Sequence, residues 1–296
     1  MSKRFSLFLS FLLVFLTFTG IFSYIYITRY HGPSEQAVLI LMYHDIRENP
    51  VEEDNPWAIS QDVFRRQMQT LRDEGYTVVT FDDLIAFVDG GRRLPERPVV
   101  ITFDDGYGSN LELAAPILAE FGMSATISVI GEARGQSTYR DTDHPRIPHF
   151  YLEEARPWVE RGVIQIQHHS YDMHMWEPFE TPETYRSGAL QRPDETEEEY
   201  RAAFRQDFET LRIKIEDILG TAVTVYTYPG GLYNEITEEM LRDLGVRVTL
   251  TTYWGINVIE RRNPESLFLL KRINITEDLT GDRFIEYLDQ FWETAH

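Results

Sequence analysis

Two adjacent carboxylates end a continuous apolar run in the stretch Val99-Val100-Ile101-Thr102-Phe103-Asp104-Asp105-Gly106-Tyr107. Such a run is expected of a strand that is buried on both faces of a parallel sheet. Charges at that position are costly unless they are paired or bind a cation, so the stretch predicts a cation-binding or catalytic role for Asp104 and Asp105. The alternative is a structural Asp-Asp-Gly turn in which one aspartate caps a helix led by Asn110.

Further β-rich runs lie on both sides of this stretch and alternate with helical patterns. They cover residues 37–43, 76–79, 124–130, 163–168, 222–228, 246–252 and 267–275. Ser60 is the expected N-cap of a helix, and residues 200–218 carry a second apolar helical stripe. This alternation, without a glycine-rich dinucleotide fingerprint, predicts an α/β fold in the form of a distorted or incomplete (β/α) barrel.

In a barrel the active site lies at the carboxyl ends of the strands, so polar residues at strand ends are the candidates for chemistry. Residues 134–148 and 177–196 read as long surface loops, rich in polar residues and proline, that shape a substrate groove near the site.

The composition excludes several classes of function. A formal net charge of −20 argues against nucleic-acid binding, which needs a basic face. The acidic surface is either a solvated face or one suited to a cationic ligand. Because the chain has no cysteine, any metal must be held by His, Asp or Glu.

The N-terminus predicts the compartment. Residues 5–27 form an uncharged apolar run, long enough to span the ~30 Å hydrocarbon core of a bilayer. Lys3 and Arg4 precede it, which favours residues 1–4 in the cytoplasm and the rest of the chain outside. We therefore expect an uncleaved signal-anchor at 5–27, a linker at 28–37 and a single catalytic domain at 38–296, with a cleaved signal peptide as the alternative.

A second strand end supplies imidazoles. The stretch Ile164-Gln165-Ile166-Gln167-His168-His169-Ser170-Tyr171-Asp172-Met173-His174 places several histidines just past an apolar run. Two histidines and an aspartate suit a catalytic, zinc-like ion with a coordination position left open. We expect one divalent transition metal, with zinc first and nickel, cobalt or manganese as alternatives.

At these residues the chain resembles the polysaccharide deacetylase family, carbohydrate esterase family four, which carries the NodB-homology domain. The resemblance covers about residues 38–293. Residues 102–106 match the family's Thr-Phe-Asp-Asp-Gly motif without change, and His169-Ser170 with His174 match its second motif. The upstream Leu41-Met42-Tyr43-His44-Asp45-Ile46 is similar to the branch that includes poly-N-acetylglucosamine deacetylases.

The resemblance implies a role for each matching residue. Asp105, His169 and His174 become the metal ligands and Asp104 the general base. The backbone N–H of Gly230, in Tyr226-Thr227-Tyr228-Pro229-Gly230-Gly231, becomes a donor to the tetrahedral oxyanion, with a plain turn as the alternative.

The chain departs from the family pattern in two places. The third motif lacks the arginine that orients the base, and no counterpart is evident in the sequence. The last motif should supply a histidine as general acid, but this stretch reads Leu269-Leu270-Lys271-Arg272-Ile273-Asn274. His44, at the end of the first strand, is then the candidate proton donor, with a packed structural histidine as the alternative.

Four aromatic residues are candidates for stacking against sugar rings, with core packing as the alternative: Tyr107, Trp176, Tyr228 and Trp254.

The resemblance, together with the N-terminal apolar run, implies an extracytoplasmic, metal-dependent hydrolase that removes N-acetyl groups from a polysaccharide containing N-acetylglucosamine, such as poly-N-acetylglucosamine or peptidoglycan. The alternatives are a catalytically impaired glycan-binding module, an esterase acting on O-acetylated polysaccharide, and a metal-dependent phosphoesterase. The histidines weigh against the last, because Mg²⁺ phosphoesterase sites favour oxygen ligands.

Overall fold

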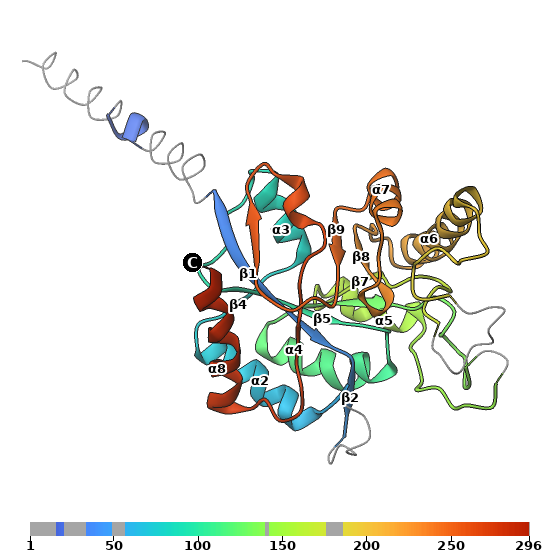
Figure 1. Cartoon of the computed structure of the whole chain (residues 1–296). Coiled ribbons are helices and arrows are strands. Elements are labelled where there is room, and N and C mark those ends of the chain that lie inside the picture. The colour runs from blue at the N-terminus through green and yellow to red at the C-terminus, as the bar shows by residue number, and fades with distance from the viewer. Residues whose placement is uncertain (1–15, 21–33, 49–56, 140–141, 176–185, 296) are drawn as a thin grey trace, which may run out of the picture.

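The computed structural model describes residues 16–20, 34–48, 57–139, 142–175 and 186–295 (Figure 1). The strands are β1 (Glu35–Tyr43), β2 (Asp45–Arg47), β3 (Ala58–Ser60), β4 (Thr77–Val78), β5 (Pro98–Phe103), β6 (Ala125–Val129), β7 (Ile164–His168), β8 (Val225–Thr227), β9 (Val248–Leu250), β10 (Asn257–Glu260) and β11 (Ile273–Asn274). The longer helices are α2 (Gln61–Asp73), α3 (Phe81–Val88), α4 (Ala115–Phe121), α5 (Leu152–Glu160), α6 (Glu197–Leu219), α7 (Glu235–Asp243) and α8 (Gly281–Trp292). Short helical turns are η1 (Asn110–Ala114), η2 (Pro229–Gly231), η3 (Pro264–Leu267) and η4 (Glu293–Ala295).

The main sheet follows the order β10-β1-β5-β6-β7-β8-β9, and its neighbours from β1 to β9 are parallel. β10 pairs antiparallel with the first half of β1, and β11 pairs parallel with its second half. A parallel bridge joins Leu250 to Leu270, so residues 270–274 connect β9 to β1 across the open side of the curled sheet. The prediction of an α/β fold with a distorted barrel is confirmed.

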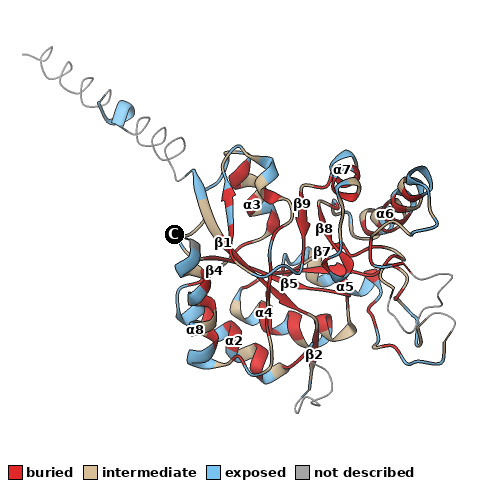
Figure 2. Cartoon of the chain, viewed as in Figure 1, coloured by how far each residue is buried: buried red, intermediate tan, exposed pale blue. Residues whose placement is uncertain are grey.

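Side chains alternate between two cores along the central strands, as the period of a strand requires. Leu39, Leu41 and Ile101 pack in the large core beneath the outer helices. Val38 and Val100 face the other way, into a second core with residues of α3. Figure 2 shows the strands and the inward helix faces as buried. The even-numbered positions of β1 and β5 therefore point into the barrel, and Asp104 continues that series.

Local capping fixes where the helices begin. Ser60 is the N-cap of α2, as predicted, and its side chain accepts a hydrogen bond from the Val63 N–H. Such a cap contributes about 1 kcal/mol. Thr196 and Glu199 form a reciprocal capping box at the start of α6, which covers the stripe predicted at 200–218. Each cap sets the register in which an apolar helix face meets the sheet.

One predicted strand is largely wrong. Residues 267–275 contain the end of η3, an irregular segment and only the short β11. The segment is irregular because Leu270 bridges to β9 while Ile273 and Asn274 pair with β1, so no single neighbour extends along it. Three short strands, β2, β3 and β10, were not predicted.

In the part of the chain that the structure describes, no helix is both long and apolar enough to cross a membrane. Of the predicted anchor at 5–27, only residues 16–20 are described. The anchor, the linker and the domain boundaries therefore stay predictions.

Candidate active site

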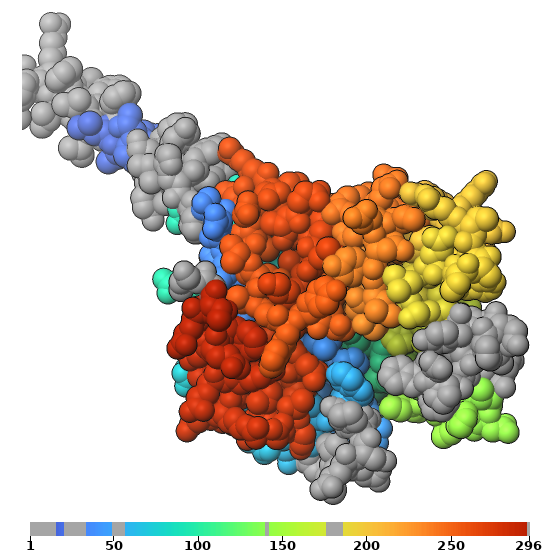
Figure 3. Space-filling view, viewed as in Figure 1, coloured from blue at the N-terminus to red at the C-terminus, as the bar shows by residue number. Residues whose placement is uncertain are grey.

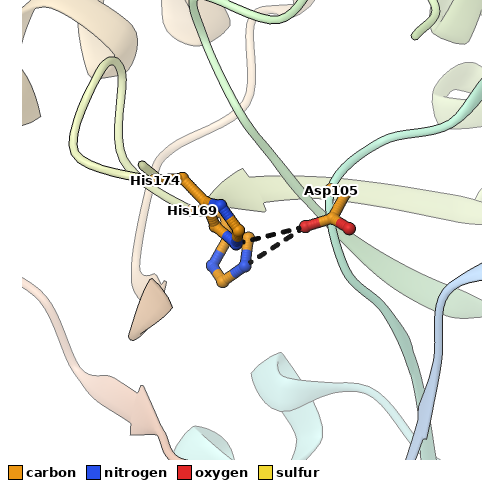
Figure 4. Close-up of side chains that lie close together, drawn as sticks. All are labelled: Asp105, His169 and His174. Atoms are coloured by element: carbon orange, nitrogen blue, oxygen red, sulfur yellow. Dashed lines mark ion pairs between the residues drawn. The ribbon is translucent and has the colours of Figure 1, made fainter. Parts of the chain in front are cut away.

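Three side chains converge at the carboxyl ends of β5 and β7. Asp105 follows β5, His169 follows β7, and His174 comes from the loop after it. The Nε2 atoms of His169 and His174 each lie 3.5 Å from Oδ1 of Asp105 (Figure 4). The three donor atoms all lie within 4.8 Å of one another. The residues predicted as metal ligands are thus brought together with their donor atoms facing one point.

The surroundings keep these donors in the form that binds a cation. His169 donates from Nδ1 to the carbonyl of Thr227 at 2.8 Å, which leaves Nε2 with its lone pair toward Asp105. Burial lowers the pKa of His169 to about 4, so this ring is neutral at pH 7. Burial alone would raise the pKa of Asp105, but His174 and the other nearby histidines outweigh it and hold this pKa well below its usual range. The set fits one divalent transition metal.

The Asp-Asp-Gly turn gives Asp105 its direction. Asp105 has φ 72°, a conformation that non-glycine residues rarely adopt, and such strain is concentrated at functional sites. Gly106 follows with φ 87°, where an added Cβ would lie 2.9 Å from Val129. The alternative in which an aspartate caps the next helix is wrong, because η1 begins after Ser109 without a side-chain cap.

Asp104 is held by an arginine that the sequence did not reveal. Arg272 is fully buried, and its two terminal nitrogens each lie 2.7 Å from one oxygen of Asp104. Its Nε donates to the carbonyl of Thr251 at 2.8 Å, which fixes the plane of the guanidinium. Burial raises the pKa of Asp104, but Arg272 and the neighbouring histidines outweigh it and keep this pKa below its usual value. The prediction that the orienting arginine has no counterpart is therefore wrong.

His44 also lies near Asp104. Its Nε2 is 4.0 Å from Oδ2 of Asp104, and its ring centroid is 4.9 Å from that of Trp57. The Asn110 side chain donates to the backbone carbonyl of His44 at 2.7 Å, which positions the residue just past β1. His44 is partly exposed and lines the cavity, which suits a proton donor better than a packed core histidine.

One cavity of about 280 Å³ joins these groups. Gly230 reaches it from η2 with φ 61°, and among the described residues no hydrogen-bond acceptor takes its N–H. Tyr107, predicted as a sugar contact, also lines the cavity and packs against His149 at 4.8 Å. Several lining residues were not singled out in the sequence: Trp57, Tyr139, Arg146 and His149. The last three belong to or border the loop 134–148, whose place near the site was predicted.

The other predicted sugar contacts lie elsewhere. Tyr228 is fully buried and donates its hydroxyl to Glu238 at 2.7 Å, so the prediction that it contacts substrate is wrong. It follows β8 with its side chain turned into the core. Trp254 is 62% exposed and does not line the cavity, but packs on Tyr287 and Phe291. Trp176 lies outside the described residues.

A buried carboxylate on α6 fixes the loop between the two histidine ligands. Both oxygens of Asp207 accept backbone hydrogen bonds, from Tyr171 at 2.8 Å and from Asp172 at 2.6 Å. Burial raises the pKa of Asp207 to about 7, although these two hydrogen bonds lower it. Asp207 therefore determines where His174 lies relative to His169 without touching either ring.

A carboxylate kept ionised beside an Asp-His-His cluster, at the carboxyl rim of a curled α/β sheet, is the arrangement of a hydrolase with a candidate metal site. The family model for polysaccharide deacetylase matches residues 91–249, and the chain belongs to this family.

Known proteins agree with this assignment. The chain is 26% identical over 250 residues to the Bacillus subtilis (strain 168) protein YxkH, whose name places it among the polysaccharide deacetylases. The match covers 84% of this chain and 75% of that one. It is 25% identical to the poly-beta-1,6-N-acetyl-D-glucosamine N-deacetylase of Escherichia coli (strain K12), over 84% of this chain but only 38% of the longer enzyme.

Among solved structures, a de-N-acetylase from Aggregatibacter actinomycetemcomitans superposes with a TM-score of 0.73 at 20% identity. The superposition covers 85% of this chain and all of the other, so the two share one fold.

Proposed function

We propose that this enzyme removes N-acetyl groups from a cell-surface polysaccharide of N-acetylglucosamine, and releases acetate. The observation that carries the proposal is the pairing of two differently held carboxylates in one cavity. Asp105 faces His169 and His174, whereas Asp104 is clamped by Arg272. One carboxylate is thereby available as a ligand and the other as a base. The E. coli relative named for poly-beta-1,6-N-acetyl-D-glucosamine supports that polymer as first candidate, with peptidoglycan as the second.

Asp105, His169 and His174 are the residues that would hold the metal. A divalent ion bound there supplies Lewis acidity, which polarises an acetamide carbonyl and makes water more acidic. The remaining chemistry belongs to the chain. The ionised Asp104 accepts a proton from the attacking water as the oxygen bonds to the carbonyl carbon. The Gly230 N–H donates to the oxyanion that develops.

The reaction ends with cleavage of the carbon–nitrogen bond. The departing nitrogen takes a proton as the bond breaks, and His44 is the partly exposed group beside Asp104 that is placed to give it. Water and the acetamide thus yield acetate and a glucosamine unit. Arg272 stays in place throughout, orients Asp104 and keeps it ionised until Asp104 takes the proton from water.

Acetate release tests the proposal. The fragment from residue 31 onward is incubated with N-acetylglucosamine oligomers, with and without a chelator, beside a His174→Ala variant. We expect release from the parent that stops on chelation, and little from the variant. Acetate released only from an O-acetylated polymer would instead make the enzyme an esterase. Binding of the oligomer with no release from any substrate would support a glycan-binding module.

We further propose that residues 5–27 anchor the enzyme in the membrane with the catalytic domain outside. Lys3 and Arg4 before the uncharged run support this orientation. Protease added to intact cells should digest the domain. A mature protein that begins near residue 30 and is free in the medium would contradict the anchor.

A further inference from the structure

A second hollow lies beside the catalytic cavity, on the face of α8. It has a volume of about 410 Å³, and Trp254, Tyr287, Thr276, Leu279 and Gln290 line it together with three charged side chains, Asp278, Glu286 and Arg283. None of these residues belongs to the lining of the catalytic cavity. In Figure 3 the dark red C-terminal helix lies directly beside the orange segment that precedes it in the chain.

The floor of this hollow, which we call the α8 hollow, is aromatic. The rings of Trp254 and Tyr287 lie 5.9 Å apart, and Trp254 meets Phe291 edge-on at 5.5 Å. Tyr287 donates its hydroxyl to the carbonyl of Asn274, so the ring is held against β11. These contacts hold Trp254 in place although 62% of it is exposed, which is unusual for a side chain with so much apolar surface. A fixed, exposed indole is a stacking surface for a flat ligand or a cation.

The charges around the α8 hollow favour a cation. Asp278 is paired with Arg283 at 2.6 Å, and the Thr276 hydroxyl also donates to it. Glu286 is exposed, and within the described part of the chain no cation pairs with it. One carboxylate thus remains for a ligand next to the indole.

The α8 hollow and the catalytic cavity are joined by two short connections. Thr252 lines the cavity and Trp254, two residues later, lines the hollow. Met42 lines the cavity and pairs with Asn274, two residues before Thr276 of the hollow. Two residues of extended chain span about 7 Å. The α8 hollow and the cavity therefore lie within the reach of one oligosaccharide.

We propose that the α8 hollow binds a glucosamine unit, already freed of its acetyl group, of the same polymer whose next units occupy the catalytic cavity. The inference rests on the proposed function. The indole of Trp254 stacks on the sugar and its ammonium group, and Glu286 pairs with that ammonium. The enzyme thereby holds a partly deacetylated chain better than a fully acetylated one.

The first test is binding of a fully deacetylated glucosamine hexamer, which has no acetyl group to lose, measured by calorimetry on the full chain. Trp254→Ala should weaken binding about tenfold. Glu286→Gln should weaken binding of this hexamer about threefold and leave binding of the fully acetylated hexamer unchanged. Tyr253→Ala is the matched control, since Tyr253 is 57% exposed but packs on Tyr233 instead.

The second test is the ratio of acetate release from a half-deacetylated hexamer to that from an N-acetylated dimer. Trp254→Ala should lower this ratio about tenfold, and Tyr253→Ala should not change it. The proposal would be overturned if Trp254→Ala and Tyr253→Ala lowered this ratio of acetate release equally. It would also be overturned if Trp254→Ala left hexamer binding unchanged. If no oligomer yields acetate the proposed function fails, whereas the calorimetry still decides whether the α8 hollow binds the amino sugar.

Discussion

Replacing Arg272 by methionine would leave a buried carboxylate without its counter-charge. The side chains of Arg272 and Asp104 are 0% and 4% exposed. Removal of one partner from a buried pair typically costs about 3–5 kcal/mol, because the remaining charge keeps its desolvation penalty. We therefore expect the free energy of unfolding at pH 7 to fall by about that amount. Adding Asp104→Asn to the variant should restore a large part of it.

The same change should alter the pH dependence of catalysis. Arg272 is the main cause that lowers the pKa of Asp104, and burial raises this pKa when the cation is gone. Asp104 would then be protonated at a higher pH, so the acid limb of kcat/KM should move upward in the metal-loaded variant. Arg272→Lys keeps the charge but loses the paired hydrogen bonds. The acid limb of this variant should therefore lie between those of the parent and of Arg272→Met.

Arg186→Met is the matched control. Arg186 forms a similar buried, two-pronged pair with Glu195, at 2.7 and 2.9 Å, on the loop before α6. Its loss should cost stability but leave the acid limb where it is in the parent. For all variants the free energy of unfolding is measured at the same pH, and kcat/KM is measured over a pH range that covers the acid limb. An Arg272→Met protein with the parental acid limb, and stability within about 1 kcal/mol of the parent, would refute this account of the base.

Three further outcomes are expected. Asp104→Asn should keep its metal while turnover falls by roughly 10²–10⁴. Asp105→Asn should lose metal and activity together. Elemental analysis and acetate release, measured on both variants, distinguish these two outcomes. Asp207→Asn should weaken metal binding with Asp105, His169 and His174 intact, because asparagine offers one acceptor oxygen where Asp207 offers two. Unchanged affinity in a metal titration would contradict this. The metal-free protein should lose stability as pH falls from about 6.5 toward 5. Over this range histidines become protonated in the unfolded chain, whereas the buried histidines of the native protein stay neutral. Burial lowers the pKa of three of them, to about 4, 3 and 4 for His149, His168 and His169. The raised pKa of Asp207 opposes one of the three, so in denaturant titrations the loss should steepen as pH falls and approach about 2.7 kcal/mol per pH unit near pH 5. Flat stability would exclude these neutral histidines.

The central strands could be predicted because each carries its own signal. β5 is buried at all six of its positions, 98–103, so a continuous apolar run in the sequence marks it. β10 instead alternates between buried and exposed residues over four positions at the sheet edge. So short a pattern is also common in loops, which is why it was missed.

The site was predictable where its residues follow strand ends in order, as Asp104, Asp105 and His169 do. Arg272 could not be found in this way. It is adjacent to Lys271, and the sequence alone does not distinguish these two basic residues. In the structure Lys271 is exposed, whereas Arg272 is fully buried. The path of residues 270–274 from β9 to β1 decides which of the two side chains points into the barrel. That path depends on contacts distant in sequence.

Residues 270–274 also set the order in which the enzyme can be completed. Asp104 receives its counter-charge from a residue 168 positions further along the chain. Because the N-terminal part of a protein is made first, β5 is present long before Arg272. Until then a buried Asp104 would lack its counter-charge, which costs free energy. We therefore expect Asp104 to reach its native, ionised orientation only when the closing segment has been added.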